Sequence, residues 1–271
     1  METKFKADPY NSKNRLIQKE EIYNLCNNLG LMKNNYFHQS YKINDISIYQ
    51  KAFVHTSYTK LKDYEEYEKP EDCLPLQGES YEKMEFLGDS FLGNIVSTYL
   101  FKRYVEIHNQ DEGFLTKLKI RLVCGEQLAY LSEKIGLDKY IILSKHVDIN
   151  CEGRSNTHIL EDVYEALLGA IYLDTGDHEL VSKFVIHTIE KYVDFSDLIL
   201  KDNNYKDQLL RYFQHNFKVF PIYKTKKEEN IFKCEIYMED MIISKGEGKS
   251  KKKSEQEASR LALIQYHVIS D

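Results

Sequence analysis

The segment YEKMEFLGD, at residues 81–89, constrains the fold of this chain more than any other part of the sequence. It places Glu82, Glu85 and Asp89 at spacings of three, four and seven residues, which lie on one face of an α-helix. Like charges at these spacings repel one another, and the only local cation is Lys83. Because a divalent cation would relieve this repulsion, the pattern favours a helix whose acidic face binds a metal ion.

A second helical segment carries two more acids. In HILEDVYEALLGAIYLD, at residues 158–174, Asp162 and Glu165 lie three residues apart and interrupt a face that we expect to be buried. A buried carboxylate without a partner is energetically unfavourable, whereas carboxylate oxygens are ligands that Mg²⁺ prefers. For either segment alone, solvent-facing acids are the simpler explanation, so the spacing by itself leaves both interpretations open.

The hydrophobic pattern divides the chain into two parts. Apolar residues recur at helical spacing from Ile17 onward, whereas residues 59–80 are charged, hold two of the four prolines and lack periodicity, so we expect a loop there. The strongest amphipathic helical segments lie at residues 81–105, 113–136, 158–174 and near 178–195. After a polar junction around 196–204, the pattern predicts a helix at 205–216, three short strands between 221 and 245 and a helix at about 250–268. We therefore predict an all-α domain at 17–196, followed by a small α+β domain of order α-β-β-β-α at 203–269.

Composition disfavours several classes of protein. With 42% hydrophobic and 30% charged residues, the chain has the balance of a soluble globular protein, and its apolar runs are too short to span a bilayer. The first 16 residues contain no apolar segment typical of a secretory signal. Five cysteines, odd in number and without CxxC spacing, disfavour a disulfide framework and a zinc site. We expect a protein that is not secreted, has no membrane span and works in a reducing intracellular compartment, the cytoplasm or the nucleus.

The net charge of −6 hides an uneven distribution along the chain. Residues 201–271 contain 14 Lys and Arg against 11 Asp and Glu, which leaves 23 against 32 for residues 1–200. The basic part includes GEGKSKKKSEQEASRLAL, at 246–263, in which lysines gather at the start of a helix and oppose its macrodipole. A bound phosphate would remove this conflict, with Gly246 and Gly248 letting the chain approach closely. We expect this helix start to contact phosphate.

The acidic segments closely resemble the ribonuclease III family. The resemblance begins with AFVHTSY at 52–58, includes SYEKMEFLGDSFLG, and continues through DEGFLTKLKIRLVCGEQLAYLSEKIGL and ILEDVYEALLGAIYLD, so it covers most of residues 47–175. It implies a helical endonuclease domain that cleaves double-stranded RNA to 5′-phosphate and 3′-hydroxyl ends with short 3′ overhangs, in RNA processing or decay. His55 is expected to be a packed helix residue rather than a catalyst.

The resemblance also assigns roles to individual acids. It implies that Glu85, Asp162 and Glu165 are ligands of a catalytic Mg²⁺, for which Mn²⁺ can substitute, with Asp89 beside them in the active centre. No serine, cysteine or histidine nucleophile is then needed.

Three further positions match the family as well. Glu82 and Glu112 match acids associated with substrate engagement or a second cation, and Phe86 matches the centre of a two-fold homodimer. Two sites related by such symmetry suit the two antiparallel strands of a duplex.

The C-terminal part resembles a double-stranded-RNA-binding domain. Lys251 and Lys252 match its phosphate-contacting lysines, with Lys249 beside them and Lys206 fitting the pattern of the first helix. Glu255 stands where many relatives carry a third lysine, and we expect weaker electrostatics from it. Leu210 and Arg211 replace a glutamine–glutamate pair that reaches the minor groove, so we expect weakened contacts there.

A protein that binds or sequesters double-stranded RNA without cleaving it is the alternative. The acids distinguish the two functions, because a protein that only binds RNA has no use for the four together, Glu85, Asp89, Asp162 and Glu165.

Overall fold

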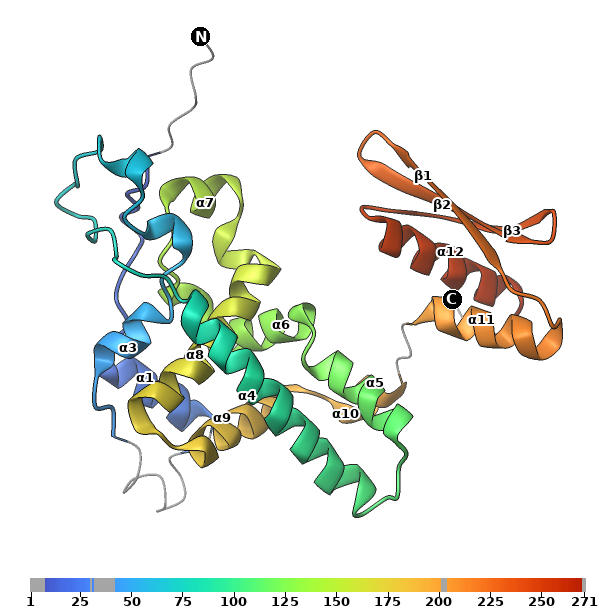
Figure 1. Ribbon diagram of the computed structural model, residues 1–271, viewed down its shortest axis with the longest axis horizontal. Coiled ribbons are helices and arrows are strands. Elements are labelled where there is room, and N and C mark those ends of the chain that lie inside the picture. The colour runs from blue at the N-terminus through green and yellow to red at the C-terminus, as the bar shows by residue number, and fades with distance from the viewer. Residues whose placement is uncertain (1–7, 30, 32–41, 201–203, 270–271) are drawn as a thin grey trace, which may run out of the picture. The chain divides into compact units, whose positions relative to one another are not determined.

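A computed structural model describes residues 8–29, 31, 42–200 and 204–269. The chain divides into two compact units, residues 1–198 and 199–271 (Figure 1). Our predicted domain limits, 17–196 and 203–269, remain predictions, and residue 203 lies outside the described residues. Among the described residues, no helix is both long enough and apolar enough to cross a bilayer.

The first unit is built from helices and short helical turns, as predicted. Its α-helices are α1 (Lys19–Asn28), α3 (Ile46–Lys51), α4 (Glu82–Leu100), α5 (Glu112–Leu122), α6 (Gly125–Ile135), α7 (Lys145–Asn150), α8 (Thr157–Thr175) and α9 (His178–Tyr192), with α10 (Phe195–Leu200) at its end. Its shorter turns are the 3₁₀ helices η1 (Thr56–Tyr58), η2 (Lys62–Tyr64), η4 (Leu137–Tyr140) and η5 (Gly153–Ser155), and the π-helical turn η3 (Phe101–Val105).

Helix α8 forms the centre of this unit and packs along α4 (Figure 1). Apolar residues on all sides of α8 are buried, from Ile159 to Ile171, which explains its nearly continuous hydrophobic sequence. Two glycines bring the helices together. A Cβ atom on Gly88 would lie 1.8 Å from the carbonyl oxygen of Glu165, and one on Gly169 would lie 2.3 Å from that of Met84. Only glycine therefore permits this backbone contact.

Two details of the first unit differ from the predicted pattern. The segment expected as one helix at 113–136 is two, because Cys124 adopts an extended conformation and begins α6. Part of the expected polar junction at 196–204 is helix α10. Its apolar residues explain this, because Phe195 and Leu198 pack against the core of the first unit. The Phe195 ring also lies 4.5 Å from the Arg103 guanidinium, and the Leu198 carbonyl accepts a hydrogen bond from Arg121.

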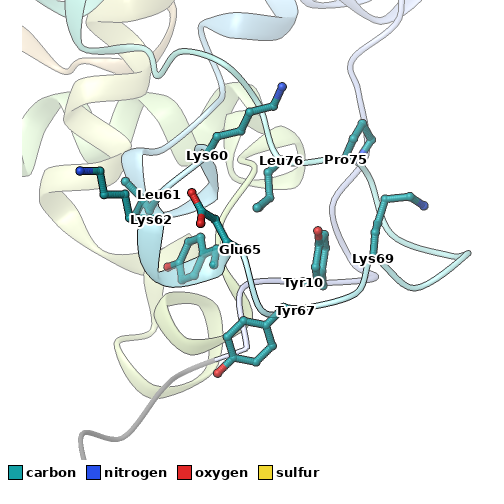
Figure 2. A pocket seen from close by; sticks show the side chains of 10 residues that line it. Tyr10, Lys60, Leu61, Lys62, Glu65, Tyr67, Lys69, Pro75 and Leu76 are labelled. Atoms are coloured by element: carbon teal, nitrogen blue, oxygen red, sulfur yellow. The ribbon is translucent and has the colours of Figure 1, made fainter.

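Residues 59–80 form a loop, as predicted, apart from the single turn η2. Its two ends are joined, because the Lys60 N–H donates to the Gln77 carbonyl at 3.0 Å and the Gln77 N–H donates to the Tyr58 carbonyl at 3.0 Å. Residues of the loop and Tyr10 line an open pocket of about 480 Å³, and none of the acids described above lines it (Figure 2).

The second unit has the predicted order α-β-β-β-α. Its elements are α11 (Tyr205–Asn216), β1 (Ile222–Glu228), β2 (Ile231–Met238), β3 (Met241–Gly248) and α12 (Lys251–Gln265). The strands form an antiparallel sheet of order β1-β2-β3, and both helices pack on it through a small apolar core that includes Leu209, Phe213 and Ile236. A Cβ on Gly246 would lie 2.2 Å from the Ala258 nitrogen, and one on Gly248 would lie 2.6 Å from the Ser254 nitrogen. These glycines therefore let β3 approach the backbone of α12, and the approach to a phosphate that we expected of them stays a prediction.

Candidate active site and RNA-binding surface

The packing of α4 on α8 gathers the acids of both segments. Glu85 and Asp89 come from α4, and Asp162 and Glu165 come from α8. The backbone of Glu165 lies at the contact itself, since its carbonyl faces Gly88, and the residue is 7% exposed. The charges of Asp89, Glu85 and Asp162 all act on its carboxylate. The four predicted acids therefore belong to one electrostatic cluster, which we call the acid cluster.

Repulsion and burial both act on this cluster. Burial, with the charges of Asp89, Glu161 and other acids, raises the pKa of Glu165 to about 8. Burial is also the main cause that raises the pKa of Glu85 and of Asp162. The charged carboxylates are therefore disfavoured at all three positions, and the neighbouring histidines His55 and His158 only partly offset this at Asp162.

The nearby lysines are engaged elsewhere. Lys83, the local cation in the sequence, pairs with Glu79 at 3.0 Å, and Lys51 pairs with the same carboxylate at 2.7 Å. Within the described residues, the Glu165 carboxylate has neither a hydrogen-bond donor nor a salt-bridge partner.

The chemistry of these side chains fits a divalent cation. Across the described parts of the chain, no three His, Cys, Asp or Glu side chains are already arranged around one point as ligands. The cluster nevertheless offers only hard oxygen donors, and it holds unneutralised carboxylates in a partly buried setting, where a divalent cation is the usual counter-charge. Small rotations of the carboxylates would have to accompany binding.

Glu161 is a member of the cluster that the sequence analysis missed. It contributes to the raised pKa of both Glu165 and Glu85, and it also lies 3.6 Å from Nδ1 of His158. Its spacing of four residues from Glu165 was the available signal, since both then lie on one face of α8.

Glu82 and Glu112 lie at different places relative to the cluster. Glu82 begins α4, accepts a hydrogen bond from the Ser80 hydroxyl at 3.0 Å and adds its charge to that around Glu85. Glu112 begins α5, and its carboxylate accepts a hydrogen bond from the Thr116 hydroxyl at 2.7 Å. Since Phe114 packs on Tyr104, 5.3 Å between ring centres, Glu112 is near the far end of α4. The helical rise puts it roughly 20 Å from Asp89.

Two other predicted residues have clear positions. Phe86 projects from α4 and is 76% exposed, an unusual environment for a large apolar ring. His55 is half-buried as expected, but it does not lie on a helix: it precedes η1, and its Nδ1 accepts a hydrogen bond from the Ser57 N–H at 3.1 Å. The reason is that Val54 and Ile142 form a β-bridge, which keeps this segment extended.

The lysines of the second unit fall into two groups. Lys249, Lys251 and Lys252 are exposed at the start of α12, where the Ser250 side chain caps the helix. Lys206 instead pairs with Glu255 at 2.6 Å and lies 4.5 Å from the centre of the Tyr223 ring. The acid at the third-lysine position thus pairs with a partly exposed lysine of its own domain.

Known proteins share both parts of this architecture. Residues 45–193 match the Ribonuclease-III-like family, and residues 205–266 match the double-stranded RNA binding motif. A "Ribonuclease 3" of Leptospira interrogans is 34% identical over 81% of this chain and 84% of its own length. A "Probable ribonuclease 3" of Acanthamoeba polyphaga mimivirus is 36% identical over 84% of this chain, which spans 39% of that protein. The solved nuclease domain of ribonuclease III from Campylobacter jejuni is 27% identical, with a TM-score of 0.48, over 65% of this chain and all of its own. From the family matches and the Leptospira relative, we conclude that the chain belongs to the ribonuclease III family.

Proposed function

We propose that this chain is an endoribonuclease that cleaves double-stranded RNA by metal-dependent hydrolysis, in RNA processing or decay. The products would carry 5′-phosphate and 3′-hydroxyl ends with short 3′ overhangs. The observation that carries the proposal is the acid cluster, in a family of metal-dependent nucleases. Its carboxylates come from two packed helices, and among the described residues no lysine or arginine forms a salt bridge with them. We assign the nuclease domain to residues 17–196 and the RNA-binding domain to 203–269, in an intracellular, reducing compartment.

We assign Glu85, Asp89, Asp162 and Glu165 as ligands of Mg²⁺, with Mn²⁺ as a substitute. When bound, the ion would polarise the scissile phosphate and supply hydroxide for in-line attack at neutral pH. The chain's own contribution is to hold the oxygens in one partly buried place. Glu165, whose pKa is about 8, must give up a carboxyl proton before it can act as a ligand.

The remaining acids and Phe86 complete the proposed enzyme. We assign Glu82 and Glu112 to substrate engagement or a second cation, and the separation of Glu112 from the cluster favours contact with another part of the duplex. The exposed ring of Phe86 would lie at the two-fold axis of a homodimer, so that each protomer acts on one strand.

The second unit would hold the duplex by its phosphates. We assign Lys249, Lys251 and Lys252 to this contact, because they surround the N-terminus of α12 and form no salt bridge with another described residue. Lys206 is assigned a weaker share, since its ammonium group already pairs with Glu255. Such a domain reads A-form shape more than base sequence.

Cleavage of a long duplex with mapped product ends tests this function. We expect Mg²⁺-dependent cleavage by the wild type and a loss of at least ~100-fold in Asp89→Asn and Glu165→Gln, each of which removes a proposed ligand. Glu79→Gln is the matched control, because Glu79 is an acid next to α4 that pairs with lysines outside the cluster. A wild type that binds the duplex but leaves it intact in Mg²⁺ and Mn²⁺ would instead favour the non-catalytic RNA-binding protein.

A further inference from the structure

Tyr81 joins the two helices that carry the acid cluster. It immediately precedes α4 and is 2% exposed. Its hydroxyl donates a hydrogen bond to Oδ2 of Asp162, on α8, at 2.9 Å. The residue therefore connects the start of one acidic helix to a carboxylate of the other.

The backbone of Tyr81 is fixed on both sides. Its N–H donates to the Val54 carbonyl at 2.9 Å, and its own carbonyl accepts the first hydrogen bonds of α4, from Met84 at 2.8 Å and Glu85 at 3.0 Å. The ring lies 5.9 Å from that of His55, centre to centre. Because neither the backbone nor the ring can move freely, the direction of the hydroxyl is set before any ligand arrives.

Asp162 differs from the other proposed ligands because its carboxylate is held by a side-chain hydrogen bond. Among the described residues, it is the only one of the four whose carboxylate receives a hydrogen bond from another side chain. That bond occupies Oδ2 and limits rotation of the carboxylate, which leaves Oδ1 for another partner. A buried tyrosine hydroxyl needs some acceptor in any fold, but a backbone carbonyl would serve equally well. Here the acceptor is a member of the acid cluster.

We infer that Tyr81 is a positioning residue that orients the Asp162 carboxylate toward a divalent cation. The inference rests on the proposed function, in which Asp162 is a metal ligand. Hydrogen-bond partners of metal ligands orient them, and their loss typically weakens metal affinity or activity 10–100-fold. Tyr81→Phe removes only the hydroxyl and keeps the buried ring, so we expect Mn²⁺ and Mg²⁺ to bind roughly 10-fold or more weakly.

Tyr58→Phe provides a matched control. Tyr58 is 0% exposed, and its hydroxyl donates to the Leu74 carbonyl at 2.8 Å, in the loop rather than in the acid cluster. The two substitutions thus remove the same chemical group from equally buried places. A loss of stability alone would affect both variants, whereas a loss of metal affinity would affect only Tyr81→Phe.

The experiment measures Mn²⁺ binding to the full chain without RNA, from the electron paramagnetic resonance signal of the free ion. Cleavage is then followed as a function of Mg²⁺ concentration. We expect weaker Mn²⁺ binding in Tyr81→Phe, a matching increase in the Mg²⁺ needed for half-maximal cleavage, and recovery of cleavage at high Mg²⁺. Tyr58→Phe should match the wild type in both measurements.

A double mutant separates positioning from a general change in folding. In Asp162→Asn, which removes the acceptor carboxylate, adding Tyr81→Phe should weaken Mn²⁺ binding no further, because the two side chains act as one unit. Equal Mn²⁺ affinities for the wild type and Tyr81→Phe would overturn the positioning role and leave the proposed function standing. A wild type without Mn²⁺ affinity would overturn both.

Discussion

Glu165 should make the metal-free chain lose stability as the pH rises. Its pKa is raised from 4.5 to about 8, mainly by burial, so between these values the folded chain holds a proton that the unfolded chain has released. Between about pH 4.5 and about pH 8, the free energy of unfolding therefore falls by about 1.36 kcal/mol for each unit of rising pH. The stabilising effect of the proton is complete below about pH 4.5 and is lost by about pH 8. Between about pH 5 and about pH 9 the loss amounts to at most about 4 kcal/mol.

Glu165→Gln isolates this effect. The amide has nearly the same shape and is uncharged throughout, so the variant should match the wild type at about pH 5 and exceed its stability at about pH 9 by up to about 4 kcal/mol. Urea unfolding followed by far-ultraviolet circular dichroism, in the presence of a chelator, measures the difference. With a slope of about 2 kcal/mol per molar urea, the midpoints should separate by up to about 2 M.

Glu79→Gln is the control for this measurement. Lys51 and Lys83 lower the pKa of Glu79 to about 2, so its charge does not change between about pH 5 and about pH 9 and its removal should have a pH-independent effect. Parallel stability curves for the wild type and Glu165→Gln would refute the reasoning. Added Mg²⁺ should restore the wild type at about pH 9 and leave Glu165→Gln nearly unchanged, because only the former offers the full ligand set.

Three further predictions concern packing, RNA binding and assembly. Gly88→Ala should destabilise the chain by about 3 kcal/mol or more, since its Cβ would lie 1.8 Å from a backbone oxygen. Gly93→Ala, whose Cβ would meet only the Lys119 ammonium at 4.0 Å, should be neutral or stabilising by up to about 1 kcal/mol. Equal changes in Tm would contradict the close packing of α4 on α8. Lys251→Ala and Lys252→Ala should each weaken duplex binding and reduce its logarithmic salt slope by about 1, as measured by fluorescence anisotropy; an unchanged slope would exclude a phosphate contact. Phe86→Asp should convert a homodimer to a monomer in sedimentation experiments with little change in monomer stability, because the ring is 76% exposed; a monomeric wild type would reject the dimer.

Much of the fold could be predicted because it depends on local patterns. Helical spacing alone indicated that Glu82, Glu85 and Asp89 share a face, and the period of the apolar residues predicted α8, α11 and the three strands. The all-α and α-β-β-β-α arrangement is confirmed. The break at Cys124 was missed although Gly125 directly follows it, because a single glycine is tolerated inside a helix and does not by itself indicate a helix end.

Contacts between distant segments required the tertiary structure. The sequence named Lys83 as the cation nearest to the acids, but Lys83 pairs with Glu79, which also pairs with Lys51 from 28 residues away. The assignment of Lys206 to RNA stays a prediction, but only the structure shows that Lys206 pairs with Glu255, 49 residues away. The sequence shows which charged side chains are present, but only the packing of the chain decides which acid each lysine pairs with.

The sequence by itself therefore determined which acids exist and which helix face carries each of them, because helical periodicity is a property of the local chain. Only the tertiary structure decided that α4 and α8 approach closely enough, at Gly88, to bury Glu165 and raise its pKa to about 8. It also added Glu161 to the cluster, separated Glu112 from it and turned the Tyr81 hydroxyl toward Asp162. The physical reason is that burial and charge repulsion depend on distances between helices, which the spacing within one helix does not determine.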